Sequence, residues 1–413
     1  MHDVAITGLG IVSCLGTGAE KVAKALREGR SGIRLDPERE RLGFRSALTG
    51  FIGDFVPPRF TGPAGIDRKR RRTLTEFGLQ ACAAALEAMD MAGWTEEERR
   101  GERTGLIVGN DTSALASVEQ ADIARREGST LPIGAGLVFQ ALTSTVSMNL
   151  NVLIGNRGAS WTLSGACASG GHAVGQAADL IALGRQDRAL AGGVQEINWQ
   201  SVASFDATNA FSVQHDDPEG ALRPFDADRD GLVPSGGAAM VALERWDLAK
   251  GRGAEILGRV LAYAFSSDGH SLSVPSGDGL RRCMTECLER GSILPGEVDH
   301  VNAHATSTPV GDAVEAEAIA GVFRGARPWV SSFKSMVGHE MWMAGAAQVV
   351  YSVLTGRAGF IAPNKNFVRQ EEGAPPLRIP AQAVDEKPSI VLCNSAGFGG
   401  TNSCILLDLS IGG

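Results

Sequence analysis

Short apolar runs alternate with amphipathic stretches along most of the chain. Residues 4–15 form the first run, which is almost continuously apolar, and a stretch with Val22 and Leu26 at helical spacing follows it. A buried strand followed by an amphipathic helix opens an α/β unit. Because the alternation continues to the end of the chain, we expect sheets packed between helices.

The same pattern predicts the remaining elements. Strands are expected at residues 104–109, 188–194, 236–243, 256–265, 298–303, 328–333, 389–394 and 402–408. Helices are expected at residues 73–92, 168–183, 278–290, 311–323 and 340–355. The composition turns polar at residues 249–254, which is the best internal boundary. The chain therefore divides into two predicted halves, 1–250 and 251–413.

Composition narrows the class of protein. The chain has 413 residues, of which 43% are hydrophobic and 53 are glycine, so it is long enough for two domains and typical of a globular α/β protein. Its net charge of −8 argues against nucleic acid as the main ligand. The seven cysteines are spread out without CxxC spacing, which fits neither a disulfide framework nor a zinc site, so we predict no metal.

Other common classes of protein are also disfavoured. No apolar run approaches the ~18 residues of a membrane span, and no signal-like segment precedes the first strand, so we expect a cytoplasmic protein without membrane insertion. Gly8 and Gly10 interrupt the apolar run at residues 4–15 with the spacing that begins a dinucleotide fingerprint. The third glycine of that fingerprint is missing, because Ser13 occupies its position, and we expect no such site.

One cysteine lies where a predicted strand turns into a helix. The run Trp161-Thr162-Leu163 ends at small residues, and Cys167 opens the helix that follows. Free N–H groups at a helix start carry partial positive charge, which favours the thiolate and can hold a developing oxyanion. Cys167 is therefore a candidate nucleophile for acyl transfer. The alternative is a small buried hydrophobe, which is the commoner role of a free cysteine.

Three later segments place polar residues at the ends of apolar strands. In the first, a strand ends at His304 and continues into a threonine-rich turn. The second places Lys334 and His339 around the start of a helix, and the third, residues 392–402, is a glycine loop between two strands. Each segment alone is a weak signal, because a histidine at a strand end or a glycine turn is more often structural than catalytic.

Together these segments resemble the β-ketoacyl-acyl carrier protein synthases, the condensing enzymes of the thiolase-like superfamily. The matching residues are Ala-Cys-Ala around Cys167, His304 within His-Ala-Thr-Ser-Thr-Pro-Val-Gly-Asp, Lys334 five residues before His339, and the terminal Gly-Phe-Gly-Gly-Thr-Asn. The resemblance covers essentially the whole chain and is greatest to the bacterial elongating synthases of types I and II and their polyketide relatives. It implies a duplicated α/β thiolase-like fold, a five-layered α-β-α-β-α sandwich of two mixed sheets, in subunits that pair as a homodimer or a heterodimer.

The resemblance also implies a reaction and roles for these residues. Cys167 would take an acyl chain from a carrier-protein thioester, and malonyl carrier protein would then lose carbon dioxide and attack this acyl group. His304 and His339 would donate hydrogen bonds to the enolate as it forms. Lys334 and Glu315 would pair beside them and set their protonation. The product would be a 3-oxoacyl carrier protein of fatty acid or polyketide-like chain elongation.

Further residues are implied to hold the substrate. Thr306 and Thr308 match positions that hydrogen-bond the phosphopantetheine arm, which the acyl carrier protein brings, so no cofactor of the enzyme itself is expected. The backbone N–H groups of Cys167 and Phe398 would form the oxyanion hole, and Phe398 would gate the acyl pocket. The predicted substrate-binding set is Thr306, Thr308, Gly399, Gly400, Asn110, Thr112, Met341 and Trp342.

The basic run Asp67-Arg68-Lys69-Arg70-Arg71-Arg72 allows two interpretations. A run of charges is usually a solvated face. Acyl carrier proteins are acidic, however, and charges at the rim of an interface steer the encounter of two proteins. The run is therefore also a candidate docking patch for the carrier protein.

Four positions depart from the pattern of the family. Gln348 stands where some relatives have a glutamate of a monovalent-cation site near Asn302 and Asn394, so we do not predict that cation.

The other three departures concern the acyl pocket. After His339 a small, glycine-rich run is usual, but here Trp342 enters the predicted helix, either near the acyl pocket or outward into the neighbouring core. Ala396 stands where phenylalanine is common, and residues 110–112 replace a glycine-rich stretch at the bottom of the pocket across the dimer. These departures support the hypothesis of a specialised synthase, for example of an aryl polyene or another polyketide-like pathway.

Two other functions are considered. A thiolase-type acyl-CoA acyltransferase would carry a second catalytic cysteine in the C-terminal glycine loop, where this chain has Phe398. A non-catalytic partner subunit, similar to a chain-length factor, would share the fold but lack the nucleophile. The presence of Cys167, His304 and His339 counts against that second function.

Overall fold

The computed structural model describes residues 1–53, 55–57, 66 and 68–411. Its strands are β1 (Val4–Ser13), β2 (Gly16–Thr17), β3 (Ile33–Leu35), β4 (Leu48–Gly50), β5 (Thr104–Gly109), β6 (Ser160–Leu163), β7 (Arg188–Gln195), β8 (Gly237–Arg245), β9 (Gly258–Ser267), β10 (His300–Asn302), β11 (Trp329–Ser331), β12 (Ile390–Gly397) and β13 (Thr401–Asp408). Among the described residues, no helix combines the length and the apolar character that crossing a bilayer requires.

The helices lie mostly between these strands along the chain. The α-helices are α1 (Ala19–Arg27), α2 (Pro37–Arg41), α3 (Arg68–Arg71), α4 (Glu76–Met91), α5 (Glu96–Arg99), α6 (Ala114–Glu127), α7 (Leu137–Ala141), α8 (Thr145–Ile154), α9 (Ser169–Ala182), α10 (Trp199–Asp206), α11 (Trp246–Gly251), α12 (Asp278–Gly291), α13 (Pro309–Val322), α14 (Lys334–Val337) and α15 (Ala344–Ala358). The short 3₁₀ turns are η1 (Ala166–Ala168), η2 (Pro218–Gly220), η3 (Pro295–Glu297), η4 (Met341–Met343) and η5 (Phe398–Gly400).

The two halves of the chain repeat one sheet topology. Strands of the first half lie in the order β6-β5-β7-β8-β1, and those of the second in the order β11-β10-β12-β13-β9. In each half, two parallel pairs are followed by two antiparallel pairs. The expected duplication into two mixed sheets is therefore confirmed. Antiparallel pairing of β1 with β9 through Val4, Ala5 and Ile6 links the halves into one continuous hydrogen-bonded sheet.

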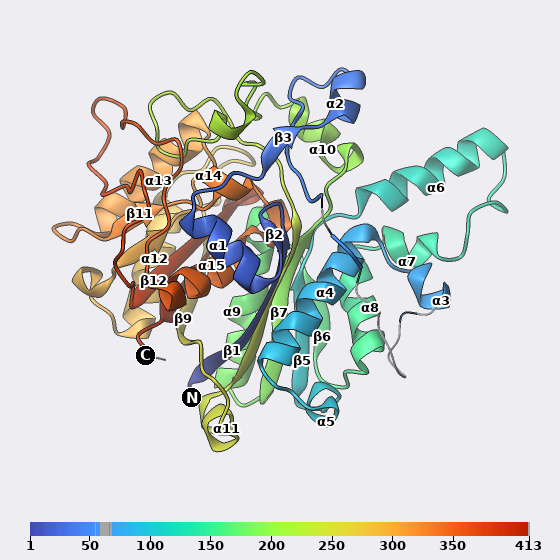
Figure 1. Ribbon diagram of the computed structural model, residues 1–413, viewed down its shortest axis with the longest axis horizontal. Coiled ribbons are helices and arrows are strands. Elements are labelled where there is room, and N and C mark those ends of the chain that lie inside the picture. The colour runs from blue at the N-terminus through green and yellow to red at the C-terminus, as the bar shows by residue number, and fades with distance from the viewer. Residues whose placement is uncertain (54, 58–65, 67, 412–413) are drawn as a thin grey trace.

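Helices cover both faces of each half in five layers (Figure 1). The middle layer contains α9 and α15, which pack on each other and contact strands of both halves. On one outer face α4 packs on β1 and β8, and on the other α12 packs on β9 and β13 with α13 beside it. Because α15 is buried on every side from Ala344 to Gly356, its sequence is almost free of charge, as expected for a central helix.

Most predicted elements agree with the structure, and the differences have local causes. The strand at residues 104–109 is reproduced, whereas the helix predicted at 73–92 begins at Glu76 because Thr75 caps it and accepts a hydrogen bond from the Gly78 N–H. The helix predicted at 340–355 begins only at Ala344, after the tight turn η4. The segment after β7 contains the helix α10, which the pattern of apolar residues did not predict. The domain boundary at residue 250 stays a prediction.

The structure also explains the glycine pair in β1. A Cβ atom added to Gly8 would lie 2.0 Å from the Ala88 carbonyl oxygen, and one added to Gly10 would lie 1.8 Å from the Ala84 carbonyl oxygen. Both carbonyls belong to α4, so the missing side chains let this helix pack directly on the strand. The two glycines serve helix packing, which agrees with the absence of a dinucleotide fingerprint.

We expect Gly10→Ala to lower the free energy of unfolding by about 1–3 kcal/mol, because α4 must move away from β1 to make room for the methyl group. The measurement is the midpoint of thermal or denaturant unfolding. Gly251→Ala is the matched control, since nothing lies within 4 Å of a Cβ at that position, in α11. Equal midpoints for the two variants would contradict this account of the packing.

Candidate active site

Cys167 lies in the tight turn η1, between β6 and α9. The residue before it, Ala166, has φ 46°, in the left-handed region that side chains rarely adopt. Ser169 fixes this turn, because its Oγ accepts a hydrogen bond from the Gly165 N–H (2.9 Å) and donates one to the Ala166 carbonyl (2.6 Å). The expected strand–turn–helix around Cys167 is therefore confirmed, and the thiol is buried at the N-terminus of α9.

Two histidines from the second half of the chain lie next to this thiol. His339 Nε2 is 3.2 Å from Cys167 Sγ, and the His339 and His304 rings meet edge to face with centroids 5.2 Å apart. The backbone of His339 is fixed by hydrogen bonds to Val233 (2.7 Å) and Ser235 (2.9 Å). The three residues that the sequence analysis placed in separate segments thus form one cluster, in which Cys167 and His339 are buried and His304 is partly exposed.

The hydrogen-bond partners of the two rings decide which nitrogen carries the proton. The Nδ1 atoms of His304 and His339 are buried and have no hydrogen-bond partner. A buried N–H without a partner costs more than a buried lone pair, so the proton of each ring belongs on Nε2. Burial and the positive charge of Lys334 both lower the pKa of His304 and of His339 well below the usual value. Both rings are therefore neutral and can donate from Nε2.

Lys334 is buried in the same cluster, and its Nζ has no hydrogen-bond partner. Burial lowers the pKa of Lys334 to about 8, although the carboxyls of Glu315 and Glu340 act in the opposite direction. Lys334 and Glu315 form no hydrogen bond or ion pair, but each charge acts on the pKa of the other, so the expected pairing is electrostatic. Glu315 instead accepts hydrogen bonds from the His304 N–H (2.9 Å) and Asn394 Nδ2 (3.2 Å), and burial raises its pKa to about 7.

Burial also acts on the nucleophile. It raises the pKa of Cys167 to about 12, and Asp111 adds to this rise, whereas Lys334 and the backbone N–H groups of Cys167 and Phe398 lower the pKa. The N–H groups at the helix start thus favour the thiolate, as expected, but desolvation outweighs them in the resting site. The two N–H groups do reach the sulfur, and their role as an oxyanion hole stays a prediction.

The glycine loop between β12 and β13 forms η5 and carries Phe398 at its first position. The Phe398 ring is 45% exposed and stacks on Phe205 with ring centroids 5.9 Å apart. Gly399 and Gly400 both have φ 78°, which only glycine adopts without strain. The loop thus lies over the cluster with an exposed aromatic ring, as a gate would require.

The predicted phosphopantetheine-binding threonines lie together in the turn after β10. Their hydroxyl oxygens are 3.1 Å apart. Asp312 at the start of α13 fixes the turn, because its carboxylate accepts hydrogen bonds from the N–H groups of Thr306 (2.9 Å) and Ser307 (3.1 Å). Thr306 and Thr308 are therefore held as one pair of hydroxyls next to His304.

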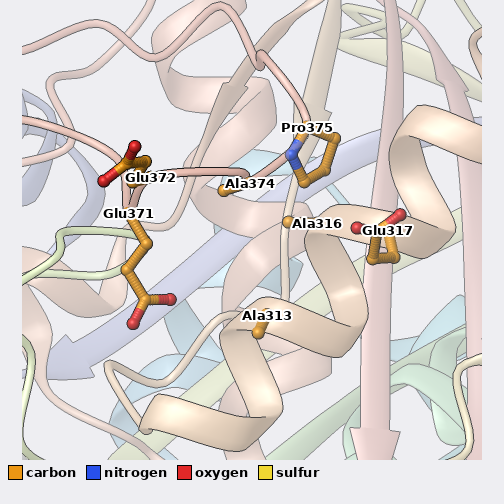
Figure 2. Close-up of a pocket in the computed structure, with 7 residues that line it drawn as sticks. All are labelled: Ala313, Ala316, Glu317, Glu371, Glu372, Ala374 and Pro375. Carbon is orange, nitrogen blue, oxygen red and sulfur yellow. The ribbon is translucent and has the colours of Figure 1, made fainter.

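A surface hollow lies behind this turn, between α13 and the loop that precedes β12 (Figure 2). Its rim is acidic, with Glu317, Glu371 and Glu372. Arg229 connects it to the candidate site, because its guanidinium binds Glu371 (2.9 Å) and donates to the Thr308 carbonyl (3.2 Å). Arg229 therefore supports the threonine turn from the side of the hollow. The lining of the hollow contains none of the predicted site residues.

Four residues of the predicted substrate-binding set were expected near the acyl pocket, and they fall into two groups: Met341, Trp342 and Thr112 lie at the cluster of Cys167, whereas Asn110 does not. Met341 and Trp342 pack in one apolar cluster with Cys167, so the alternative that Trp342 points away into the neighbouring core is wrong. Trp342 Nε1 donates to Thr112 Oγ1 (3.2 Å), which brings Thr112 to the same cluster. Asn110 is fully buried and turns its amide to the Thr143 carbonyl (2.7 Å), so it supports the loop after β5.

Sequence reasoning missed Phe205 and Asp312. Phe205 contacts both Phe398 and Trp342, but it lies in α10, a short helix without a clear apolar period. Asp312 was visible as the last residue of a matching motif, and an aspartate four residues after a threonine turn is a common partner for free backbone N–H groups. Only the first of these two residues lacked any signal in the sequence.

Family models match both halves of the chain. The model described as "Beta-ketoacyl synthase, N-terminal domain" matches residues 1–249, and the model described as "Beta-ketoacyl synthase, C-terminal domain" matches residues 257–368. The chain belongs to the beta-ketoacyl synthase family. The predicted family is thus confirmed over most of the sequence.

Relatives in this family match the chain over nearly its full length. The chain is 38% identical over 410 residues to 3-oxoacyl-[acyl-carrier-protein] synthase 1 of Escherichia coli strain K12, covering 98% of this chain and 99% of that protein. It is 37% identical over 409 residues to the protein of the same name from Haemophilus influenzae, covering 98% of both chains. A beta-ketoacyl synthase from Burkholderia phymatum has a TM-score of 0.92 at 31% identity, covering 99% of this chain and 100% of that one.

A second solved structure is similar to the chain over nearly its whole length. The ishigamide ketosynthase/chain length factor has a TM-score of 0.90 at 31% identity, covering 98% of this chain and 99% of that chain. The thiolase-like fold expected from the sequence is confirmed by these structural relatives. The cluster of Cys167, His304 and His339 therefore lies in a beta-ketoacyl synthase fold.

We expect Lys334→Met to slow alkylation of Cys167 by iodoacetamide about 10-fold at pH 7, because the cation that lowers the thiol pKa is lost. Lys334 itself loses its charge above about pH 8, so the rates of wild type and variant should converge there. The measurement is the rate of alkylation of the Cys167 peptide against pH, by mass spectrometry.

Lys365→Met is the control for this experiment, since Lys365 is an outlying lysine paired with Glu219 (3.8 Å). Methionine nearly matches the shape of Lys334, whose Nζ forms no hydrogen bond, so thermal stability should be kept. Parallel pH profiles for wild type and Lys334→Met at all pH values would contradict the electrostatic role of Lys334.

Proposed function

We propose that this protein catalyses the decarboxylative Claisen condensation of an acyl thioester on Cys167 with malonyl-acyl carrier protein. The product is a 3-oxoacyl-acyl carrier protein, in fatty acid or polyketide-like chain elongation. The distance of 3.2 Å between Cys167 Sγ and His339 Nε2 carries this proposal, together with the His304 ring, whose centroid lies 5.2 Å from that of His339. The shared name of the two full-length relatives, 3-oxoacyl-[acyl-carrier-protein] synthase 1, supports it.

The first half-reaction is acyl transfer. Cys167 Sγ attacks the thioester carbonyl of the acyl carrier protein, the bond to the phosphopantetheine sulfur breaks, and the thiol proton leaves with that sulfur. The backbone N–H groups of Cys167 and Phe398, which lower the pKa of the thiol in the resting site, donate to the negative oxygen of the tetrahedral intermediate. Because these donors are fixed by η1 and η5, they need no reorganisation during the step.

The second half-reaction forms the carbon–carbon bond. Malonyl carrier protein loses carbon dioxide, and the electron pair of the broken bond forms an enolate at the thioester. The Nε2–H groups of His304 and His339 donate to the enolate oxygen, and neutral rings suffice because they give no proton away. The enolate carbon then attacks the acyl group, and Cys167 leaves as the thiolate, which takes up a proton from solvent.

The phosphopantetheine arm of the carrier protein lies against Thr306 and Thr308 in this proposal. Their paired hydroxyls can donate and accept along the amides of the arm. Phe398 moves to admit malonyl carrier protein after the acyl group is loaded, since its ring is already half exposed. The enzyme needs no metal and no cofactor of its own for any of these steps.

The carrier protein docks on the basic helix α3 in our proposal. Lys69 and Arg71 are exposed on this helix, and Arg72 is exposed directly after it. Asp67 of the same run lies outside the described residues. A structural relative with 27% identity and a TM-score of 0.88 comes from a solved complex of a type II PKS acyl-carrier protein with its ketosynthase. Complementary charge at such a rim raises the rate of encounter with an acidic partner.

We also propose that two copies pair through β6 as a homodimer in the cytoplasm. Within the described chain, β6 ends the first half of the sheet and pairs only with β5, which leaves one strand edge open. Trp161 on this strand and Val152 on the neighbouring α8 are exposed apolar side chains. An open edge beside exposed apolar side chains favours pairing with a second copy.

The loading of Cys167 tests the reaction. Incubation with acyl carrier-protein thioesters should raise the mass of the intact protein by one acyl group, and Cys167→Ala should abolish the increase. Cys82→Ala is the control, because Cys82 is buried in α4 on the outer face. If no thioester loads onto the folded wild-type protein, the proposed function is wrong, and a non-catalytic partner subunit becomes the better explanation.

The docking surface is tested by charge reversal. We expect Arg71→Glu to raise KM for acyl carrier-protein substrates about 10-fold at low salt, with kcat nearly unchanged, because the variant repels an acidic partner. Rates with a small pantetheine thioester should stay the same. Arg324→Glu, on the exposed segment after α13, is the matched control. A similar KM for both variants would rule out α3 as the docking helix.

A further inference from the structure

The turn that carries Trp342 has the same geometry as the turn that carries Cys167. Each is a three-residue 3₁₀ turn directly before a central helix, η1 before α9 and η4 before α15. The first residue of each turn has a left-handed backbone, with φ 46° at Ala166 and φ 44° at Met341. Because the halves repeat one topology, Trp342 occupies in the second half the position of Cys167 in the first.

The two turns face each other, and the Trp342 side chain fills the space beside the nucleophile. Residues of η1 and η4 are in contact, and Trp342 is 4% exposed within the apolar cluster of Cys167. The other buried members of this cluster are Val202, Phe211, Leu232 and Met341. An acyl group on Cys167 would therefore extend into space that the indole and its neighbours now occupy.

The indole is held at both its edge and its face. Its Nε1 donates to Thr112 Oγ1 (3.2 Å) on the loop after β5. Phe205 lies against it with ring centroids 6.2 Å apart, and the other side of Phe205 stacks on Phe398. Rotating Trp342 would leave a buried N–H without an acceptor and would disturb the ring beneath the predicted gate.

The backbone of η4 cannot withdraw to make room. A Cβ atom added to either Gly170 or Gly193 would lie 2.9 Å from the Trp342 carbonyl oxygen, so this carbonyl packs directly on α9 and β7. The Met343 N–H also closes the turn on the Glu340 carbonyl (3.0 Å). Movement of the η4 backbone therefore cannot enlarge the space beside Cys167, whereas movement of the indole side chain can.

We propose that Trp342 is a specificity-determining residue that closes the acyl pocket beside Cys167 and restricts this enzyme to short acyl groups. The inference rests on the proposed function and names its substrate class, saturated acyl chains of hexanoyl length or shorter. The Thr112 hydroxyl is the second part of the device, because it holds the indole across the pocket. Chains of dodecanoyl length and longer require the indole to leave Thr112.

The test measures loading of Cys167 by carrier-protein thioesters from acetyl to hexadecanoyl, by intact mass. Wild type should load hexanoyl at least about 10-fold faster than dodecanoyl, since apolar pockets discriminate by roughly that factor for each methylene that does not fit. Trp342→Ala should raise the ratio of the dodecanoyl rate to the acetyl rate by about 10-fold or more. The ratio of the two rates separates pocket depth from a general loss of activity.

Two milder variants keep the test valid if Trp342→Ala does not fold. Thr112→Val keeps the shape of the side chain and removes the acceptor for Nε1, so dodecanoyl loading should rise less than in Trp342→Ala. Trp342→Phe removes the donor and shortens the ring, and its rate should fall between those of wild type and Trp342→Ala. Alkylation of Cys167 by iodoacetamide serves as the control that the nucleophile is intact in each variant.

The outcomes separate this inference from the proposed function. Equal loading of hexanoyl and dodecanoyl by wild type, or no gain for long chains in any of the three variants, would overturn the role of Trp342 and leave the condensation intact. If no thioester loads although iodoacetamide still alkylates Cys167, the proposed function itself fails, and the inference fails with it.

Discussion

The close backbone contact between α9 and α15 is the constraint on which the site depends. A Cβ atom added to Gly345 would lie 2.4 Å from the Gly171 nitrogen, and one added to Gly170 would lie 2.9 Å from the Ala346 nitrogen. Only glycines allow the two central helices to meet this closely. Because Cys167 precedes α9 and His339 precedes α15, this contact brings their side chains from opposite halves of the chain to 3.2 Å. A larger residue at this glycine contact would move Cys167 away from the His339 imidazole, although every functional group of the site would still be present.

The same close packing sets the electrostatics of the site. Desolvation is the first cause of every pKa shift in the cluster, and it keeps Cys167 a thiol and both histidines neutral. One buried cation, Lys334, remains without a hydrogen bond and acts through its field on all three groups. Such a site holds little charge at rest, and its hydrogen-bond donors, the imidazole and backbone N–H groups, lie around Cys167. Charge that develops there during a reaction is therefore stabilised more strongly than charge in water.

Much of this arrangement could be predicted from sequence, and the reasons are specific. The buried strands and the turn before Cys167 follow from apolar runs that end at small residues, and the family motifs identified the histidines in both later segments. The raised pKa of Cys167 and the absence of a direct Lys334–Glu315 ion pair could not be predicted, because both depend on how completely the groups are buried and on the neutral donors that Glu315 finds. Neither quantity has a local sequence signature. The contact of Phe205 with Phe398 also depends on tertiary packing alone.

The duplicated topology explains why the catalytic groups and Trp342 lie together. In both halves the central helix follows a 3₁₀ turn, so the paired helices α9 and α15 bring two equivalent turns face to face. One turn supplies the nucleophile, and its counterpart supplies Trp342, three residues after His339. Any residue at the Trp342 position must therefore border the acyl group on Cys167, whatever its own chemistry. A change of side chain at this one position alters the depth of the pocket while the catalytic geometry, which the helix contact determines, stays fixed.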